Sequence, residues 1–483
     1  MTAKTSDPVP REELELRGLQ TVAEPGVSPS PATEPHKVEG RPETEVPSAA
    51  ASMNEIGHLS SDRLPPLDPA LMSKTATWET LEMAWRSMPN EQRATAPGID
   101  GLDYEQSYAW WQRHAEQILT ALRNGRYQPF PVRRVEIFKA SGGTRPLGIP
   151  TFMDRVIQRA IQKEVDPVLD PAFAESSFGF RRGRSVHTAA EHVLESVRAG
   201  YIWAVKVDLA KFFDTVDHGC LMAKLKGITS DQNLLSLLFR YLTAGVCIKG
   251  IWHPTTMGVP QGGPLSPLLA NVVLHSLDKW LERHGHTYAR YADDFIVLVK
   301  SRKAAKRVMQ RTALYLEREL KLTVNRTKSK IQSARNGIEF LGLCISMRGI
   351  TIPKESIDKL TGYARALDKR RGRYPVEEWV GKAQSMISGW MAHYGRYMSK
   401  HDIRQVCRAM AQLRPAPETV RDDGGHVCTR PTMLQIWNEV LHGKPASHYQ
   451  ARAAGRETAS DSLASAPYPP TGRSDVTEGR PTA

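Results

Sequence analysis

Two adjacent aspartates, Asp293 and Asp294, lie between two stretches rich in strand-forming residues, 288–291 and 295–299. This pattern predicts a β-hairpin that presents both carboxylates at its tip. Such a tip is suited to holding a divalent metal ion at a fixed depth in a cleft. Aspartate is also a common turn residue because its side chain bonds its own backbone, so an ordinary turn is the alternative. Other residues of the chain are needed to distinguish a metal site from an ordinary turn.

A third aspartate ends another predicted strand. Residues 203–208 alternate between apolar and polar side chains, which places Lys206 and Asp208 on the side opposite the valines. Nucleotidyl transfer uses two divalent ions roughly 3.5–4 Å apart. Magnesium prefers oxygen ligands and usually takes one or two protein carboxylates. We therefore expect Asp208, Asp293 and Asp294 to form a site for two Mg²⁺ ions, with Mn²⁺ as a substitute.

Charge and cysteine content narrow the class of protein. The 65 Lys and Arg residues exceed the 52 Asp and Glu residues, and the net charge of +13 favours a polyanionic partner. Residues 1–65 contain 6 basic and 11 acidic residues, so the basic character belongs to the rest of the chain. A merely solvated basic surface is the alternative. The five cysteines form no Cys-x-x-Cys pair, which argues against a zinc site or disulfide framework and fits a reducing cytosol.

Composition divides the chain into four segments. Residues 1–68 and 446–483 are rich in Pro, Glu, Ser, Thr and Ala, and we expect two disordered tails. Residues 69–345 mix helical and strand patterns, which predicts an α+β domain on an antiparallel sheet, and residues 346–445 are mainly helical. No apolar stretch approaches the ~20 residues that span a bilayer. The N-terminus lacks the apolar core of a signal peptide, so we expect a cytoplasmic protein without a membrane partner.

Periodicity also predicts individual elements. A basic hairpin is expected where a strand at 132–139 is followed by a Ser-Gly-Gly-Thr turn and residues 145–150. The predicted helices cover residues 78–88, 104–122, 154–169, 221–242, 265–281, 303–320, 355–373 and 379–398.

A series of short motifs occurs in order between about residues 95 and 345. They are Pro97-Gly98-Ile99-Asp100-Gly101, Lys139 with Arg145-Pro146-Leu147-Gly148-Ile149-Pro150, Phe178-Gly179-Phe180-Arg181 with Gly183-Arg184-Ser185, the Asp208 strand, Pro260-Gln261-Gly262-Gly263-Pro264-Leu265-Ser266-Pro267, Tyr291-Ala292-Asp293-Asp294, Asn325 with Lys328, and Phe340-Leu341-Gly342. This series resembles the bacterial group II intron-encoded reverse transcriptases and maturases. The resemblance covers about half of the chain.

The resemblance implies a right-hand polymerase, with fingers and an antiparallel palm sheet in residues 69–345 and a helical thumb or maturase segment in residues 346–445. It implies an RNA-directed DNA polymerase that copies intron RNA into DNA and assists intron splicing and mobility. Its partners would be the intron RNA template, a DNA primer or target, and deoxynucleoside triphosphates. Whether two copies assemble into a homodimer stays open.

The resemblance also assigns roles to the carboxylates and to the basic hairpin. Asp208 and Asp293 would be the metal ligands, and Asp294 would support them or the primer end. Lys139 and Arg145 would bind the incoming triphosphate, because a basic hairpin closing over phosphates favours their negative charge. A surface hairpin with solvated charges is the alternative for these two residues.

Four further residues acquire roles in the same way. Phe213 would stack under the deoxyribose and exclude a 2′-hydroxyl, unless it is an ordinary core residue and the adjacent Phe212 takes that place. Gln261 and Gly262 would let the backbone approach the template and primer closely, with a plain turn as the alternative. Lys328 would donate a proton to pyrophosphate, or it is a solvated lysine in a basic run.

Basic residues are expected to bind RNA in two regions. Arg181, Arg182 and Arg184 would contact template phosphates, which gives salt-sensitive binding largely independent of sequence. Residues 379–398 interleave basic and aromatic side chains, which suits a thumb on a duplex or a maturase segment on structured RNA. An amphipathic core helix explains Trp390 and Tyr394 equally well.

Departures from the family pattern leave alternatives. The chain is irregular after Met398, where residues 413–417 and 422–425 break the expected helix, so splicing is less firmly implied than polymerisation. A domesticated relative serving phage defence or CRISPR adaptation is one alternative. Another is a non-catalytic RNA-binding splicing factor, although clustered carboxylates repel one another unless a metal offsets their charge.

Overall fold

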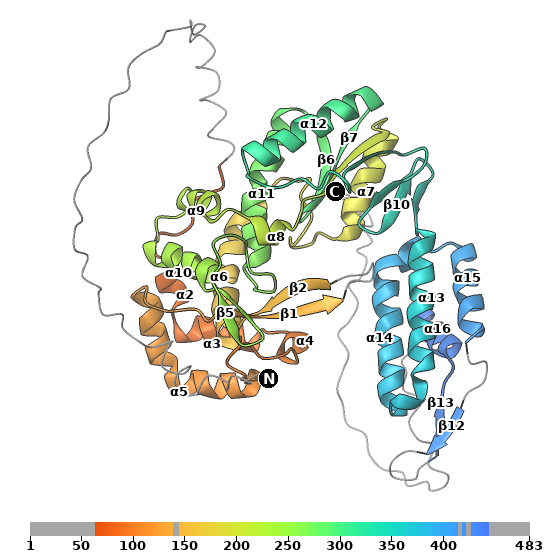
Figure 1. The fold of residues 1–483 in the computed structure, drawn as a ribbon, viewed down its shortest axis with the longest axis horizontal. Coiled ribbons are helices and arrows are strands. Elements are labelled where there is room, and N and C mark those ends of the chain that lie inside the picture. The colour runs from red at the N-terminus through yellow and green to blue at the C-terminus, as the bar shows by residue number, and fades with distance from the viewer. Residues whose placement is uncertain (1–62, 139–143, 414–417, 422–426, 444–483) are drawn as a thin grey trace, which may run out of the picture. The chain divides into compact units, whose positions relative to one another are not determined.

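The computed structural model describes residues 63–138, 144–413, 418–421 and 427–443 (Figure 1). The chain divides into two compact units between Ser356 and Ile357. The tails predicted at 1–68 and 446–483 lie outside the described residues, apart from residues 63–68. No helix in the described ranges has both the length and the hydrophobicity to cross a membrane.

The first unit begins with four helices. Trp85 and Trp111 are fully buried between these helices and α6, and the longest of the four begins with a capping box between Asp103 and Gln106. The predicted helices at 78–88 and 104–122 are confirmed, as is the break at 97–101. The four are α2 (Leu71–Thr75), α3 (Trp78–Arg86), α4 (Asn90–Arg93) and α5 (Tyr104–Arg123).

The predicted basic hairpin is present and belongs to a four-stranded sheet of order β2-β1-β4-β5. β1 (Val132–Phe138) and β2 (Thr144–Ile149) pair antiparallel, and β1 pairs parallel with β4 (Val246–Ile248), which itself forms a hairpin with β5 (Ile251–His253). Helix α6 (Phe152–Leu169) follows β2 directly, and Thr151 caps its first turn. The fingers-like part of the unit therefore joins segments that lie a hundred residues apart.

A second, fully antiparallel sheet has the order β6-β7-β3-β8. Its strands are β3 (Trp203–Val207), β6 (Thr287–Tyr291), β7 (Asp294–Val299) and β8 (Lys330–Ser333). Helices α7 (Val186–Arg198), α11 (Ser266–Arg283) and α12 (Arg302–Arg318) pack against this sheet (Figure 1). Val205 and Val207 are fully buried while Lys206 and Asp208 are only half-buried, which confirms the predicted alternation.

One predicted helix is wrong. The segment 221–242 forms two helices, α9 (His218–Lys226) and α10 (Gln232–Thr243). Gly227 ends the first, and the Asp231 carboxylate caps the second by accepting hydrogen bonds from the amides of Asn233 and Leu234. The apolar period continues across the break, so periodicity alone predicts one helix.

Short elements complete the first unit. Helix α8 (Phe212–Thr215) follows β3, and the three-residue turn Asp170–Ala172 follows α6. A three-stranded sheet of order β11-β10-β9 is made of β9 (Ile338–Phe340), β10 (Leu343–Ser346) and β11 (Gly349–Thr351).

The second unit is mainly helical and has its own core, in which Trp379, Ile387 and Trp437 are fully buried. The irregular chain expected after Met398 is wrong for two segments, because helices α15 and α16 both begin with capping boxes there. Residues 414–417 and 422–426 lie outside the described ranges. The elements are α13 (Lys354–Lys369), which begins just before the division, α14 (Val376–Tyr394), α15 (Lys400–Ala411), β12 (Glu418–Arg421), β13 (Val427–Arg430) and α16 (Met433–Leu441).

Candidate active site

Asp208 directly follows β3, at the end of this interior strand of the antiparallel sheet. Its backbone amide donates to the Ser329 hydroxyl at 3.1 Å, and its carbonyl accepts from the Asn325 amide at 2.8 Å. The Ser329 hydroxyl in turn donates to the Asn325 carbonyl at 2.8 Å. The Asn325–Ser329 turn therefore holds the backbone of Asp208 from a segment more than a hundred residues away in sequence.

Asp293 lies in the tight turn between β6 and β7. Tyr291 pairs with Asp294, so Ala292 and Asp293 are the two central residues of the hairpin. Ala292 has a φ of 56°, the left-handed conformation that glycine normally supplies at the first central position of such a turn. Because Val207 pairs with Phe295, the next residues along the two strands bring Asp208 opposite Asp294. The structure thus brings the three predicted carboxylates to one end of the sheet.

Asp294 forms an ion pair with a lysine of β3. The Lys206 ammonium lies 3.1 Å from one Asp294 oxygen and 3.2 Å from the other, with the two side chains 20% and 34% exposed. In the part of the chain that the structure describes, no group of three His, Cys, Asp or Glu side chains is arranged to hold a metal ion. Asp208 and Asp293, both half-buried, supply the oxygen ligands that Mg²⁺ prefers, and a protein site of one or two carboxylates fits that ion.

An open cleft of about 750 Å³ is lined by residues that lie near these carboxylates in sequence or in space, although none of the three carboxylates is among its lining residues. Phe213 lines it from α8, which follows the Asp208 loop, whereas Phe212 is not among the lining residues. Phe180 lines it as well, and its ring lies 6.4 Å from the Tyr291 ring of the hairpin. Of the two adjacent phenylalanines, Phe213 is therefore the one that faces the cleft.

The loop containing Gln261 and Gly262 forms one wall of the cleft and contacts β2. The Gly148 amide donates to the Gln261 carbonyl at 2.7 Å. Gly262 has a φ of 115°, and a Cβ there would lie 2.2 Å from the Gly148 carbonyl oxygen. The requirement for glycine therefore has a cause inside the protein, namely close contact between this loop and the fingers strand.

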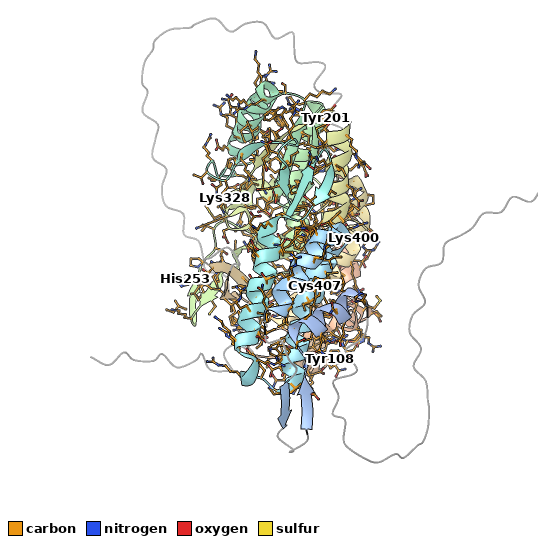
Figure 2. All side chains as sticks on the ribbon, turned by 90° about the vertical axis from the view of Figure 1, so that its right-hand side faces the viewer. Tyr108, Tyr201, His253, Lys328, Lys400 and Cys407 are labelled. Atoms are coloured by element: carbon orange, nitrogen blue, oxygen red, sulfur yellow. The ribbon has the colours of Figure 1, made fainter. Side chains whose placement is uncertain are left out.

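The predicted phosphate-binding residues are only partly described. Lys139 lies outside the described residues. Arg145 lies in β2 opposite Ile137, which places its backbone beside the cleft-lining residues of both strands. Lys328 is exposed on the Asn325–Ser329 turn that holds Asp208 (Figure 2), and its amide donates to the Asn325 side chain at 3.3 Å.

The three arginines predicted to bind template differ in availability. Arg181 is 7% exposed, and it donates to the Asp170 carboxylate at 3.0 Å and to the carbonyls of Ala174 and Ser177 at 2.6 and 3.0 Å. Its guanidinium stabilises a loop, which does not fit the predicted template contact. Arg184 is bound to the Glu175 side chain at 2.5 Å and is 20% exposed. Arg182 is the exposed arginine of the three.

Two arginines that the sequence analysis missed line the cleft from α6. Arg155 donates to the Thr95 hydroxyl and to the carbonyls of Ala96 and Pro150 at 2.6 to 2.9 Å, and burial lowers its pKa to about 10. Arg159 lies one turn further along and burial lowers its pKa too. Their four-residue spacing on a helix that directly follows the basic hairpin was the available signal.

Sequence comparisons identify the family. Residues 137–345 match the family described as reverse transcriptase (RNA-dependent DNA polymerase). Protein YkfC of Escherichia coli (strain K12) is 34% identical over 302 residues, which cover 55% of this chain and 79% of that protein. Group II intron-encoded protein LtrA of Lactococcus lactis subsp. cremoris is 29% identical over 331 residues, which cover 55% of each chain. The chain belongs to the group II intron-type reverse transcriptases.

This membership agrees with the observed architecture, an α+β unit with an antiparallel palm sheet followed by a helical unit. The chain spans about half the length of LtrA. A solved structure titled partial Cas6-RT-Cas1–Cas2 complex is 26% identical, covers 52% of this chain and 43% of that chain, and has a TM-score of 0.33.

In the helical unit, the aromatic residues of α14 pack internally. The Trp390 ring lies 4.8 Å from the Tyr394 ring and 6.1 Å from the ring of the buried Trp437 on α16. Of the two interpretations of this segment, this packing favours the amphipathic core helix for Trp390.

Proposed function

We propose that this reverse transcriptase copies group II intron RNA into DNA by two-metal nucleotidyl transfer at Asp208 and Asp293, and that it assists intron splicing and mobility. The observation that carries the proposal is the placement of both carboxylates at one end of the palm sheet beside the cleft lined by Phe213 and Gln261. The net charge of +13 supports a nucleic-acid partner.

Bound Mg²⁺ would lower the pKa of the attacking 3′-hydroxyl and neutralise the leaving pyrophosphate. Asp208 and Asp293 would bind the ions, while Lys206 neutralises Asp294 and thereby reduces repulsion among the three adjacent carboxylates. Lys139 and Arg145 would bind the triphosphate, and Lys328 would protonate the departing pyrophosphate.

The nucleic acid would be held by residues around the cleft. The Phe213 ring would support the sugar of the incoming nucleotide, and the Gln261 loop would contact the nascent pair. Arg182 is the arginine of its cluster with the exposure needed to contact template phosphates. The helical unit would supply the thumb and the surface for intron RNA.

Primer extension on an RNA template with a DNA primer, deoxynucleotides and Mg²⁺ tests the proposal. We expect the wild-type protein to extend the primer, Asp293→Ala to reduce extension to background, and chelation of the metal to do the same. Glu105→Ala, on the exposed side of α5, is the matched control and should extend normally. If the wild type extends nothing but still promotes intron splicing, the protein is a splicing factor and the polymerase proposal fails.

A further inference from the structure

Arg290, the residue before the catalytic hairpin turn, is completely buried. Its guanidinium forms a two-pronged ion pair with Asp278 of α11, at 2.8 Å from Nε to Oδ1 and 2.5 Å from Nη2 to Oδ2, and both side chains are 0% exposed. Nη2 also donates to the Ser177 hydroxyl at 2.7 Å, and Nη1 donates to the Asn271 side-chain oxygen at 2.9 Å. We call Arg290, Asp278, Asn271 and Ser177 the turn clamp.

The fifth N–H of the guanidinium reaches the turn itself. Nη1 donates to the Ala292 carbonyl at 3.2 Å, and this carbonyl belongs to the peptide bond that joins Ala292 to Asp293. With this bond all five N–H groups of the guanidinium are used. The clamp therefore holds the peptide group that immediately precedes Asp293, in a turn where Ala292 has the unfavourable φ of 56°.

Residues 176–179 contact the same turn from another side. The Arg290 amide donates to the Ser176 carbonyl at 2.9 Å, and the Phe178 amide donates to the Arg290 carbonyl at 2.8 Å. Gly179 lies so close that a Cβ there would stand 2.2 Å from the Ala292 nitrogen. The turn is thus fixed by its own strand, by α11 and by residues 176–179.

A buried ion pair is an inefficient way to stabilise a fold. Removing two charges from water costs free energy that their attraction only partly returns, and replacing such a pair with apolar residues of similar volume is often neutral or stabilising. Geometry is the property that an apolar pair cannot supply. A planar guanidinium with five directed donors fixes the groups around it in orientation as well as distance.

We propose that Arg290, held by Asp278, is a positioning residue. Through its hydrogen bond to the Ala292 carbonyl it sets the position of the Asp293 carboxylate relative to the Asp208 carboxylate. The proposal rests on the proposed function, since it specifies how the reactive geometry of that site is maintained. Misplacing a reacting group by about 1 Å can cost about 100-fold in rate. Loss of the clamp should therefore lower kcat, while KM for the nucleotide, which depends on the cleft, stays near the wild-type value.

Three variants separate positioning from stability. Arg290→Met leaves Asp278 buried and unpaired, so it should melt at a lower temperature and lose activity. The double variant Arg290→Met, Asp278→Leu removes both charges and should recover most of the melting temperature while its kcat stays about 10- to 100-fold low. Arg290→Lys keeps the charge without the planar fork and should rescue kcat only in part. Leu119→Ala, a core change on α5 away from the hairpin, is the control for destabilisation alone.

Single-nucleotide incorporation gives kcat and KM, and Mn²⁺ titration calorimetry gives a second measurement that does not need turnover. We expect weaker Mn²⁺ binding in the double variant, in the direction produced by Asp293→Asn. If the double variant recovered the wild-type kcat as well as the melting temperature, the proposal would be overturned. A wild-type protein without polymerase activity would refute the proposed function instead, and unchanged Mn²⁺ binding in the double variant would then refute the clamp as well.

Discussion

At the scale of single residues, two adjacent phenylalanines have different environments. Both rings belong to the buried core, but Phe213, which is 9% exposed, also lines the cleft, whereas Phe212, which is 2% exposed, does not. We expect Phe213→Ala to increase ribonucleotide incorporation relative to deoxyribonucleotides by about 10- to 100-fold, because the ring that would exclude the 2′-hydroxyl is gone. The measurement is kcat/KM for matched ribo- and deoxyribonucleotides.

Phe212→Ala is the matched control for this prediction. It should lower the free energy of unfolding by about 3–5 kcal/mol through loss of core packing, and leave the discrimination between the two sugars unchanged. Discrimination that falls equally in both variants would mean that the effect comes from a loosened core, and Phe213 would have no special role.

The local sequence pattern predicts which side chains face the site. It does not predict which side chains they pair with. Alternation along β3 is a local property, so the shared face of Lys206 and Asp208 follows from the sequence. The ion pair between Lys206 and Asp294 depends on the register between β3 and β7, which no local pattern contains. Arg181 and Arg182 are adjacent and alike in sequence, and only the fold around Asp170 buries the first and exposes the second.

At the scale of elements, the Gln261 loop and β2 are in close backbone contact beside the cleft. A Cβ at position 262 would lie 2.2 Å from the Gly148 carbonyl, and the φ of 115° adds backbone strain. We expect Gly262→Ala to displace the loop, destabilise the first unit by about 1–3 kcal/mol and reduce primer extension strongly. Urea unfolding and primer extension measure the two effects.

Gly362→Ala provides the comparison for that substitution. Gly362 lies inside α13, and apart from its own helical turn no described atom lies within 4 Å of its Cβ position, so alanine there should stabilise the helix by about 1 kcal/mol or less. If Gly262→Ala were equally well tolerated, the close contact with Gly148 would not be a requirement of the site.

Long periodic elements and hairpins with clear turn residues could be predicted from the sequence, but short strands could not. Strands β4 and β5 have three residues each, too few to show a period, and β5 exposes Ile251 and Trp252 in a pattern that resembles neither a buried nor an alternating strand. The division of 221–242 into two helices was hidden for the opposite reason, because the apolar period runs through the break. Strand pairing determines the first case and helix capping determines the second, and neither can be predicted from periodicity.

At the scale of the whole molecule, the two units have separate cores, and the first continues past the last recognised motif. β10 and β11 pair as a hairpin over residues 343–351, so the first unit extends beyond Gly342. The motifs mark the residues of the candidate site, whereas the end of a folded unit is set by the last strand that pairs. The sequence therefore predicts which carboxylates come together more accurately than it predicts where the first unit ends.

The stability of the whole chain should depend on pH through Asp154, which is 1% exposed at the start of α6. Burial raises its pKa from 3.8 to about 6, against the opposing hydrogen bonds from Thr151 and Tyr127. Between these two pH values the native state keeps a proton that the unfolded state releases, so rising pH lowers the free energy of unfolding, by up to about 3 kcal/mol for this group. The contribution is complete below pH 3.8 and is lost as the pH rises through 6.

Asp154→Asn removes this titration and should flatten the decline in the free energy of unfolding between pH 4.5 and 7.5. Burial also raises the pKa of Asp100 to about 6, so a residual slope should remain in the variant. Denaturant unfolding at closely spaced pH values measures the slope, with the exposed Glu105→Gln as the control that keeps the wild-type profile. Parallel profiles for the wild type and Asp154→Asn would show that Asp154 is ionised throughout this range, and that the hydrogen bonds it accepts from Thr151, Tyr127 and the Phe130 amide outweigh its burial.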